Sequence, residues 1–187
     1  MRILRAADHK RMPWKNGKGE TVEVAVFPPG ASIDDFDWRI SIATVAENGA
    51  FSLFQHVDRT LTLLSGEGII LSVEGAEDIE LTPTSVPHAF PADLPSTARL
   101  IGGRVTDLNV MTNRQRHAHH VARAEFEGEL TVQAEKALTF IVVVSPALEW
   151  ANETLGYLDA LILDTGETAY LRSRTAATIL RTEIFDR

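Results

Sequence analysis

The chain has 187 residues, 44% of them hydrophobic, and no cysteine, a composition that supports a buried core and excludes disulfides and thiolate chemistry. Its formal net charge of −8 argues against nucleic acid as a partner, because an acidic protein repels phosphate backbones. No apolar segment is long enough to act as a signal sequence or to cross a bilayer, so we expect a cytoplasmic protein without a membrane partner.

Alternating and β-branched patterns predict strands in the first half of the chain. Val22, Val24 and Val26 fall on one face of such a strand, and Ser65-Gly66-Glu67 has the composition of a hairpin turn. The predicted strands of this half are residues 21–27, 38–45, 59–64, 68–73, 79–82 and 98–102. Residues 11–20, which are polar and glycine-rich, and residues 83–95, which hold four prolines, are predicted as ordered loops.

The second half continues in the same style, without a helical period. Its predicted strands are residues 121–126 and 129–134 around Gly128, then 138–144, 157–164, 167–172 and 177–184. Many short strands separated by turns favour an all-β sandwich or barrel. We therefore predict a single domain over residues 1–187, with halves of about 1–114 and 115–187.

Arg59 is the first candidate for a binding residue. It shares a pleat face with Leu61 and Leu63, so if these leucines point into a barrel, the guanidinium lies toward its mouth. A buried guanidinium stays charged and needs an anionic partner. That partner is either a substrate carboxylate or an internal carboxylate such as Glu23, and the residues alone leave both open.

The polar loop over residues 14–21 is the second candidate. Its glycines would let backbone amides approach a ligand, with Asn16 and Thr21 as hydrogen-bonding groups and Trp14 as a wall. It is not a phosphate loop, because no helix follows and the GxxxxGK[ST] spacing is missing. On the residues alone, a structural loop that plugs one barrel end is the favoured interpretation.

A possible metal run begins at His117 and His119, with Glu125 a few residues later. The spacing differs from the His-x-His run of many cupins, and alternation places these side chains on a polar face toward solvent. A metal site needs convergent, supported ligands. We therefore expect no metal and no cofactor.

Asp107 and Asn109 alternate with Leu108 and Val110, so the two polar groups share a face. They fit either a polar cross-strand network that fixes register or a set that pairs with an arginine or orients a ligand. The network is the favoured interpretation for Asp107, and both remain open for Asn109.

Five short motifs in this order resemble the HutD/Ves family, over roughly the first 115 residues. They are residues 13–21 (PWKNGKGET), 37–43 (DWRISIA), 49–52 (GAFS), 57–59 (VDR) and 107–111 (DLNVM). The second half resembles the family in strand pattern only. The chain departs from the family at Lys18, where glycine is usual, and at Gln55-His56, where the family tends to have Pro-Gly.

The resemblance implies a bicupin-type fold, two cupin-like halves in one compact unit, without the usual metal ligands. It implies a link to bacterial histidine utilisation in a regulatory or ligand-sensing role, with urocanate or a formyl-type carboxylate as ligand. The arginine of the Val-Asp-Arg motif, which the family is thought to use for the carboxylate, corresponds to Arg59.

Our leading hypothesis is a non-catalytic protein that binds a small carboxylate, such as urocanate or a formyl compound, and modulates amino-acid catabolism. Arg59 would hold the carboxylate. The other expected site residues are the hydrogen-bonding groups Asn16, Thr21, Arg39 and Ser41, the apolar walls Trp14 and Phe54, and the adjacent His56.

Two alternatives remain open. One is a metal-independent enzyme, an isomerase or hydrolase, in which Arg59, His56 and Glu23 perform acid–base chemistry. The other is a scaffold whose barrel is filled by side chains and holds no ligand. We also expect a homodimer, because dimers are a common way to cover exposed sheet edges.

Overall fold

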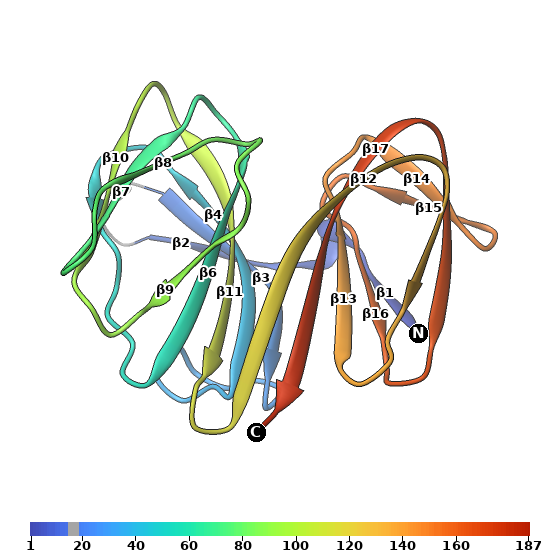
Figure 1. The fold of residues 1–187 in the computed structure, drawn as a ribbon, viewed down its shortest axis with the longest axis horizontal. Helices are drawn as coiled ribbons and strands as arrows, with labels where there is room; N and C mark the ends of the chain where they lie inside the picture. The colour runs from blue at the N-terminus through green and yellow to red at the C-terminus, as the bar shows by residue number, and fades with distance from the viewer. Residues whose placement is uncertain (15–18) are drawn as a thin grey trace. The chain divides into compact units, whose positions relative to one another are not determined.

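The computed structural model describes residues 1–14 and 19–187, which form β-strands and one short 3₁₀ helix, η1 (Ala6–Asp8) (Figure 1). The all-β prediction is confirmed. Within these residues no helix is long and apolar enough to cross a membrane. The chain divides into unit 1, Met1–His9 with His119–Arg187, and unit 2, Lys10–Ala118. The N-terminal residues Met1–His9 therefore belong with the second half of the chain, and not with the predicted first half of about residues 1–114.

Unit 2 contains two sheets, a six-stranded sheet in the order β2-β3-β4-β11-β6-β9 and a four-stranded sheet in the order β5-β10-β7-β8 (Figure 1). Leucines of the larger sheet, such as Leu61 and Leu63, share one apolar core with Ile69 and Leu71 of the smaller. The strands are β2 (Lys10–Pro13), β3 (Gly19–Phe27), β4 (Trp38–Val45), β5 (Gly49–Ala50), β6 (Val57–Ser65), β7 (Ile69–Val73), β8 (Ile79–Leu81), β9 (His88–Pro91), β10 (Ser96–Leu100) and β11 (Val105–Asn113).

Antiparallel register determines which side chains of the larger sheet face this core, because directly opposed residues lie on the same face. Leu61 and Leu63 are core residues, so the rows that contain them point inward. The inward rows are Glu23–Ser41–Asn109–Leu61–His88, Thr21–Ala43–Asp107–Leu63 and Arg39–Met111–Arg59–Phe90. Charged and polar residues thus alternate with apolar ones inside unit 2.

Two segments of unit 2 that were predicted as loops contain strands. Residues 11–20 contribute most of β2 and the start of β3, and residues 83–95 contain β9. Both β2 and β9 lie at an edge of the six-stranded sheet. Each ends on a proline, Pro13 and Pro91, which a sheet edge tolerates because a missing N–H breaks no interior ladder.

Unit 1 contains a sheet in the order β1-β16-β13-β17-β14-β15, with β12 also paired to β17. Its interior is filled by apolar side chains such as Ile141, Leu161 and Ile179, with Phe126 and Trp150 packed against them. The strands are β1 (Arg2–Leu4), β12 (His117–Gln133), β13 (Leu138–Val143), β14 (Ala147–Trp150), β15 (Glu153–Gly156), β16 (Ala160–Leu163) and β17 (Thr168–Asp186).

The strand boundaries in unit 1 differ from the predicted ones at two places. β12 runs without interruption through Gly128, and β17 joins two segments that were predicted as separate strands. Gly128 has a φ of 85°, a conformation that glycine adopts at little cost. The glycine therefore lies within one long strand, where two separate strands were predicted on either side of it.

Asp159 connects the N-terminal segment to the rest of unit 1 through hydrogen bonds. Its Oδ1 accepts a hydrogen bond from the Ala6 N–H at 2.8 Å, and its Oδ2 accepts bonds from Arg5 Nη1 at 2.8 Å and the Gly156 N–H at 3.0 Å. Burial raises the pKa of Asp159, but these hydrogen bonds and the Arg5 charge outweigh it and hold the pKa below its usual range. The ionised carboxylate is therefore the form that stabilises the fold.

Replacing Asp159 by alanine is expected to destabilise the protein by about 2 kcal/mol, because three donors lose a charged acceptor. Urea denaturation near neutral pH measures the change. The loss should be smaller in acid, since a carboxylate with a lowered pKa stabilises the fold above its unfolded pKa and loses that effect as the pH falls. Asp164→Ala, at an exposed carboxylate of the same unit, is the control. Equal effects of the two substitutions would contradict the stabilising role of the Asp159 carboxylate.

Candidate functional site

Arg59 is a buried cation without a carboxylate partner among the described residues. Its side chain projects from β6 into unit 2, and the residue is 3% exposed. Nη2 donates one hydrogen bond, to the Ser52 carbonyl oxygen at 3.2 Å, and Nε is buried without an acceptor. Burial lowers the pKa of Arg59 to about 10, with the Asp107 charge opposing this shift, so the guanidinium remains charged at neutral pH.

Three aromatic rings surround the Arg59 guanidinium. Its Cζ lies 5.2 Å from the ring centroid of Phe51, 5.4 Å from that of Phe54 and 5.7 Å from that of Phe90. Phe51 and Phe54 come from the segment between β5 and β6. The backbone N–H groups of these two residues donate to the carbonyls of Ser96 and Ala92, each at 2.9 Å. The rings offset part of the cost of burying the cation, but they accept no conventional hydrogen bond and leave most of its donors available.

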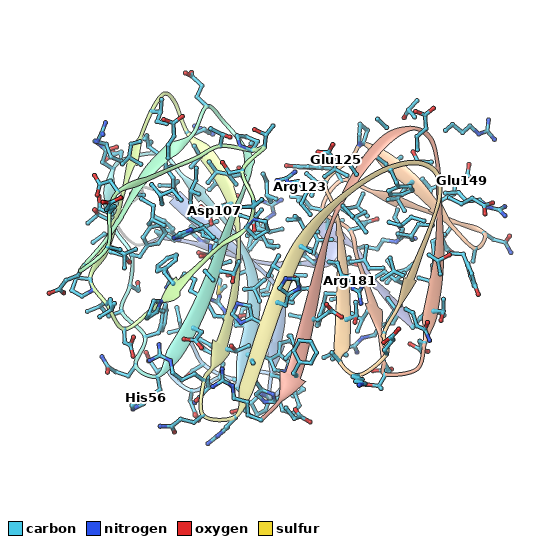
Figure 2. All side chains as sticks on the ribbon, viewed as in Figure 1. His56, Asp107, Arg123, Glu125, Glu149 and Arg181 are labelled. Atoms are coloured by element: carbon cyan, nitrogen blue, oxygen red, sulfur yellow. The ribbon has the colours of Figure 1, made fainter. Side chains whose placement is uncertain are left out.

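Asp107 is a buried carboxyl in the same interior. It is 1% exposed on β11 and accepts a hydrogen bond from Nδ2 of Asn109. Burial raises the pKa of Asp107 to about 7, although the Asn109 hydrogen bond and the Arg59 charge act in the opposite direction. Figure 2 labels it among the interior side chains of unit 2. The carboxyl therefore titrates near neutral pH.

The second buried arginine already has a carboxylate partner. Nε of Arg39 donates to Oε2 of Glu23 at 2.9 Å, with side chains 5% and 17% exposed. The sequence left open an internal ion pair between Arg59 and Glu23. In the structure Glu23 pairs with Arg39 instead. Ser41, 2% exposed, lies opposite Glu23 on the neighbouring strand.

Most of the predicted site residues lie in or against the interior of unit 2. Arg59, Arg39, Ser41 and Phe54 lie in or against the polar interior of unit 2. Thr21 belongs to the row of Asp107, and its Oγ1 accepts a hydrogen bond from Nε1 of Trp14 at 2.8 Å, while the Trp14 ring packs against the core. Asn16 and Lys18 lie outside the described residues.

His56 does not join this interior. Its side chain is exposed in the turn that precedes β6, and its φ is 60°. The acid–base set of Arg59, His56 and Glu23 is therefore not assembled, because Glu23 pairs with Arg39 and His56 faces solvent. The left-handed conformation also explains why a glycine suits this position.

Replacing His56 by glycine is expected to stabilise the protein by about 1 kcal/mol, because a residue with a Cβ is strained in the left-handed region. The entropy that glycine adds to the unfolded chain reduces this gain but does not reverse it. Thermal and urea denaturation measure the effect. Gln55→Gly, at the preceding exposed position with an ordinary φ, is the control and should destabilise. A loss of stability in both variants would contradict the prediction that the backbone at His56 is strained.

In the part of the chain that the structure describes, no three histidine, cysteine or carboxylate side chains are grouped so that they could hold a metal ion. His117 is less exposed than predicted. Its side chain is 12% exposed, with Nε2 4.0 Å from Oδ2 of Asp37 and the ring edge-on to Phe27.

Sequence reasoning missed Phe51 and Phe90 as neighbours of Arg59. Phe51 falls in the Gly-Ala-Phe-Ser motif, which was the available signal. Phe90 lies in a proline-rich segment that was predicted as a loop. Once β9 is known to pair with β6, the register places Phe90 directly opposite Arg59.

The comparisons with known proteins point to one family. The HutD family model matches residues 6–181. An uncharacterised Pseudomonas putida protein from the hutC 3′ region is 34% identical over 167 residues, which are 88% of this chain and 87% of that protein. The Ves protein of Citrobacter koseri is 44% identical over 114 residues, 58% of each chain.

Solved structures agree with this grouping. A conserved protein of unknown function from Pseudomonas aeruginosa superposes with a TM-score of 0.87 at 32% identity, covering 98% of each chain. HutD from Pseudomonas fluorescens superposes at 0.83 and 30% identity, covering all of this chain and 98% of that one. AerE from Microcystis aeruginosa, at 9% identity and 0.70, is similar in fold alone, over 95% of this chain and 97% of that one. The bicupin-type fold is confirmed.

Proposed function

The chain belongs to the HutD family, and from this premise we propose that it binds a small carboxylate inside unit 2 and acts as a non-catalytic sensor or modulator of histidine or amino-acid catabolism. The names of the family and its relatives carry the link to histidine utilisation. The observation that supports binding is Arg59, a buried cation without a carboxylate partner among the described residues.

A carboxylate is the ligand class that suits Arg59 best. A buried guanidinium is costly without an anion, and its planar fork matches the two oxygens of a carboxylate. The three surrounding phenylalanines favour a small, flat ligand over a hydrated inorganic anion. Formate and urocanate both fit this description, and the related HutD structure from Pseudomonas fluorescens was obtained in a formate condition.

Isothermal titration with formate and with urocanate tests the proposal. Arg59→Gln is expected to lower the affinity about 10- to 100-fold, because a hydrogen-bonded charged contact of this kind contributes roughly 1.5–3 kcal/mol. Arg99→Gln, at an exposed arginine on β10, is the matched control and should bind like the wild type. Equal binding by the wild type and Arg59→Gln would overturn the proposal, as would no binding across a panel of small carboxylates.

A further inference from the structure

The interior of unit 2 contains a nearly balanced set of charges. Among the residues that the structure describes, four charged side chains on the inward rows are shielded from solvent: Glu23 on β3, Arg39 on β4, Arg59 on β6 and Asp107 on β11. Lys10, which lies opposite Glu23 on the edge strand β2, is exposed. The titratable His88 on β9 shares the row of Leu61 and stacks on Phe90. The facing sheet contributes apolar side chains to this interior, which include Ile69, Leu71, Val73, Leu81 and Ala98.

The protonation state of Asp107 determines whether the charges of this interior can compensate a bound anion. With Asp107 ionised, two carboxylates balance two guanidinium groups, and an added carboxylate would leave a net negative charge in a poorly solvated space. With Asp107 protonated, the same four side chains carry one surplus positive charge, which a single carboxylate neutralises. Buried charge is tolerated only when it is compensated, so the neutral form of Asp107 is the one that accepts a ligand.

We propose that the carboxylate ligand and a proton bind together, the carboxylate at Arg59 and the proton at Asp107. This inference rests on the proposed function of Arg59 and adds the way in which that site is regulated. A protein built in this way responds both to the concentration of a monocarboxylate and to pH. A dianion should bind less tightly than a monocarboxylate, because its two negative charges exceed the single surplus positive charge of the interior.

The coupling follows from the neighbours of Asp107. The Arg59 charge acts on Asp107 and favours its ionised form in the ligand-free protein. A bound carboxylate would pair with Arg59 and cancel that support, and its own negative charge would repel an ionised Asp107. Both effects raise the proton affinity of Asp107, and they are strong because the carboxyl is 1% exposed and water screens it little.

The affinity for the carboxylate should fall as the pH rises above the pKa of Asp107. Below the pKa of the ligand-free Asp107 the proton is already present, so the affinity should be nearly constant. Above that pKa each bound carboxylate must take up a proton, so the affinity should fall by up to about tenfold per pH unit. Since burial already brings this pKa to about 7, the change should fall near neutral pH.

Titration calorimetry with sodium formate between about pH 6 and pH 9 measures the coupling, and buffers of different ionisation enthalpy report the number of protons taken up. The wild type should take up close to one proton at the alkaline end and lose affinity as the pH rises. Asp107→Asn should bind with little pH dependence and no proton uptake. His88→Gln, at the histidine on the same inward row as Leu61, is the control and should behave like the wild type.

The outcomes separate this inference from the proposed function. Formate binding by the wild type that is independent of pH would overturn the coupling and leave the Arg59 site standing, as would a pH dependence that persists in Asp107→Asn or disappears in His88→Gln. No binding of formate or urocanate by the wild type at about pH 6 would overturn both. Carbon NMR of the Asp107 carboxyl in the wild type avoids any folding defect of the variant: its pKa should rise on saturation with formate, and an unchanged pKa would overturn the coupling.

Discussion

Asp107→Asn is expected to remove a pH-dependent loss of stability from the ligand-free protein. Burial raises the pKa of Asp107 to about 7, whereas an unfolded aspartate titrates at about 3.9. Between these values the native state holds a proton that the unfolded state has released, so the free energy of unfolding falls as the pH rises. The stability is fully present below about pH 4 and is lost by about pH 7, a change on the order of 4 kcal/mol.

Urea denaturation at several pH values between about 4 and 8 measures this effect in the wild type and in Asp107→Asn. Asparagine keeps the size of the side chain and an oxygen that accepts the Asn109 hydrogen bond, but it cannot ionise. The variant should match the wild type in acid and exceed it at mildly alkaline pH. Other carboxylates, including Asp159, titrate in both proteins, so the difference between the two curves isolates position 107. Asp78→Asn, at an exposed position directly before β8, is the control. Parallel curves for Asp107→Asn and the wild type would contradict the raised pKa of Asp107.

Alternation predicted the interior strands well, because one face of each is apolar and the period of two is visible in the sequence. β4 spans the residues that were predicted for it, and β6 and β13 differ by only a few residues at their ends. The edge strands β2 and β9 were missed because few apolar residues mark them and prolines end them. β12 and β17 were divided because a glycine or a polar stretch looks the same in a turn and in a long strand.

The motif order placed Arg59, Arg39 and Ser41 in one site, and all three are buried together on the same sheet face. Partner choice could not be predicted, because it depends on register between strands that are far apart in the chain. Glu23 pairs with Arg39, which leaves Arg59 without a carboxylate among the described residues. The sequence favoured a structural network for Asp107, and the Asn109 hydrogen bond fits that interpretation, but burial raises the pKa of Asp107 to about 7 and makes it a titrating group as well.

His56 shows why closeness in sequence is a weak guide to a site. It is three residues before Arg59, and that spacing suggested a place beside the pocket. The chain turns through a left-handed conformation at this position, which directs the histidine to solvent while Arg59 points into unit 2. The left-handed backbone at position 56 favours glycine, so the histidine there is expected to lower the stability of the turn.

Arg59→Met is expected to stabilise the ligand-free protein while it abolishes carboxylate binding. The guanidinium is buried, with one hydrogen bond and no ion pair among the described residues, so an apolar side chain of similar length removes a desolvation cost. Methionine also packs well against aromatic rings such as Phe51 and Phe90. Replacing buried charge by apolar groups stabilises proteins by roughly 1–4 kcal/mol in favourable cases. The gain should be largest below about pH 7, where Asp107 is protonated and does not need the Arg59 charge.

The matched control is Arg39→Met, at the other buried arginine of the same sheet. That substitution leaves Glu23 without its ion-pair partner. We expect the free energy of unfolding to fall by about 3 kcal/mol, because breaking a buried ion pair leaves the remaining charge buried and uncompensated. Urea denaturation at about pH 6 compares the two variants, and formate titration shows whether binding is lost. If Arg59 stabilised the ligand-free protein as Arg39 does, both variants would lose stability to a similar extent. Opposite signs for the two arginines would identify Arg59 as a group whose partner arrives with the ligand.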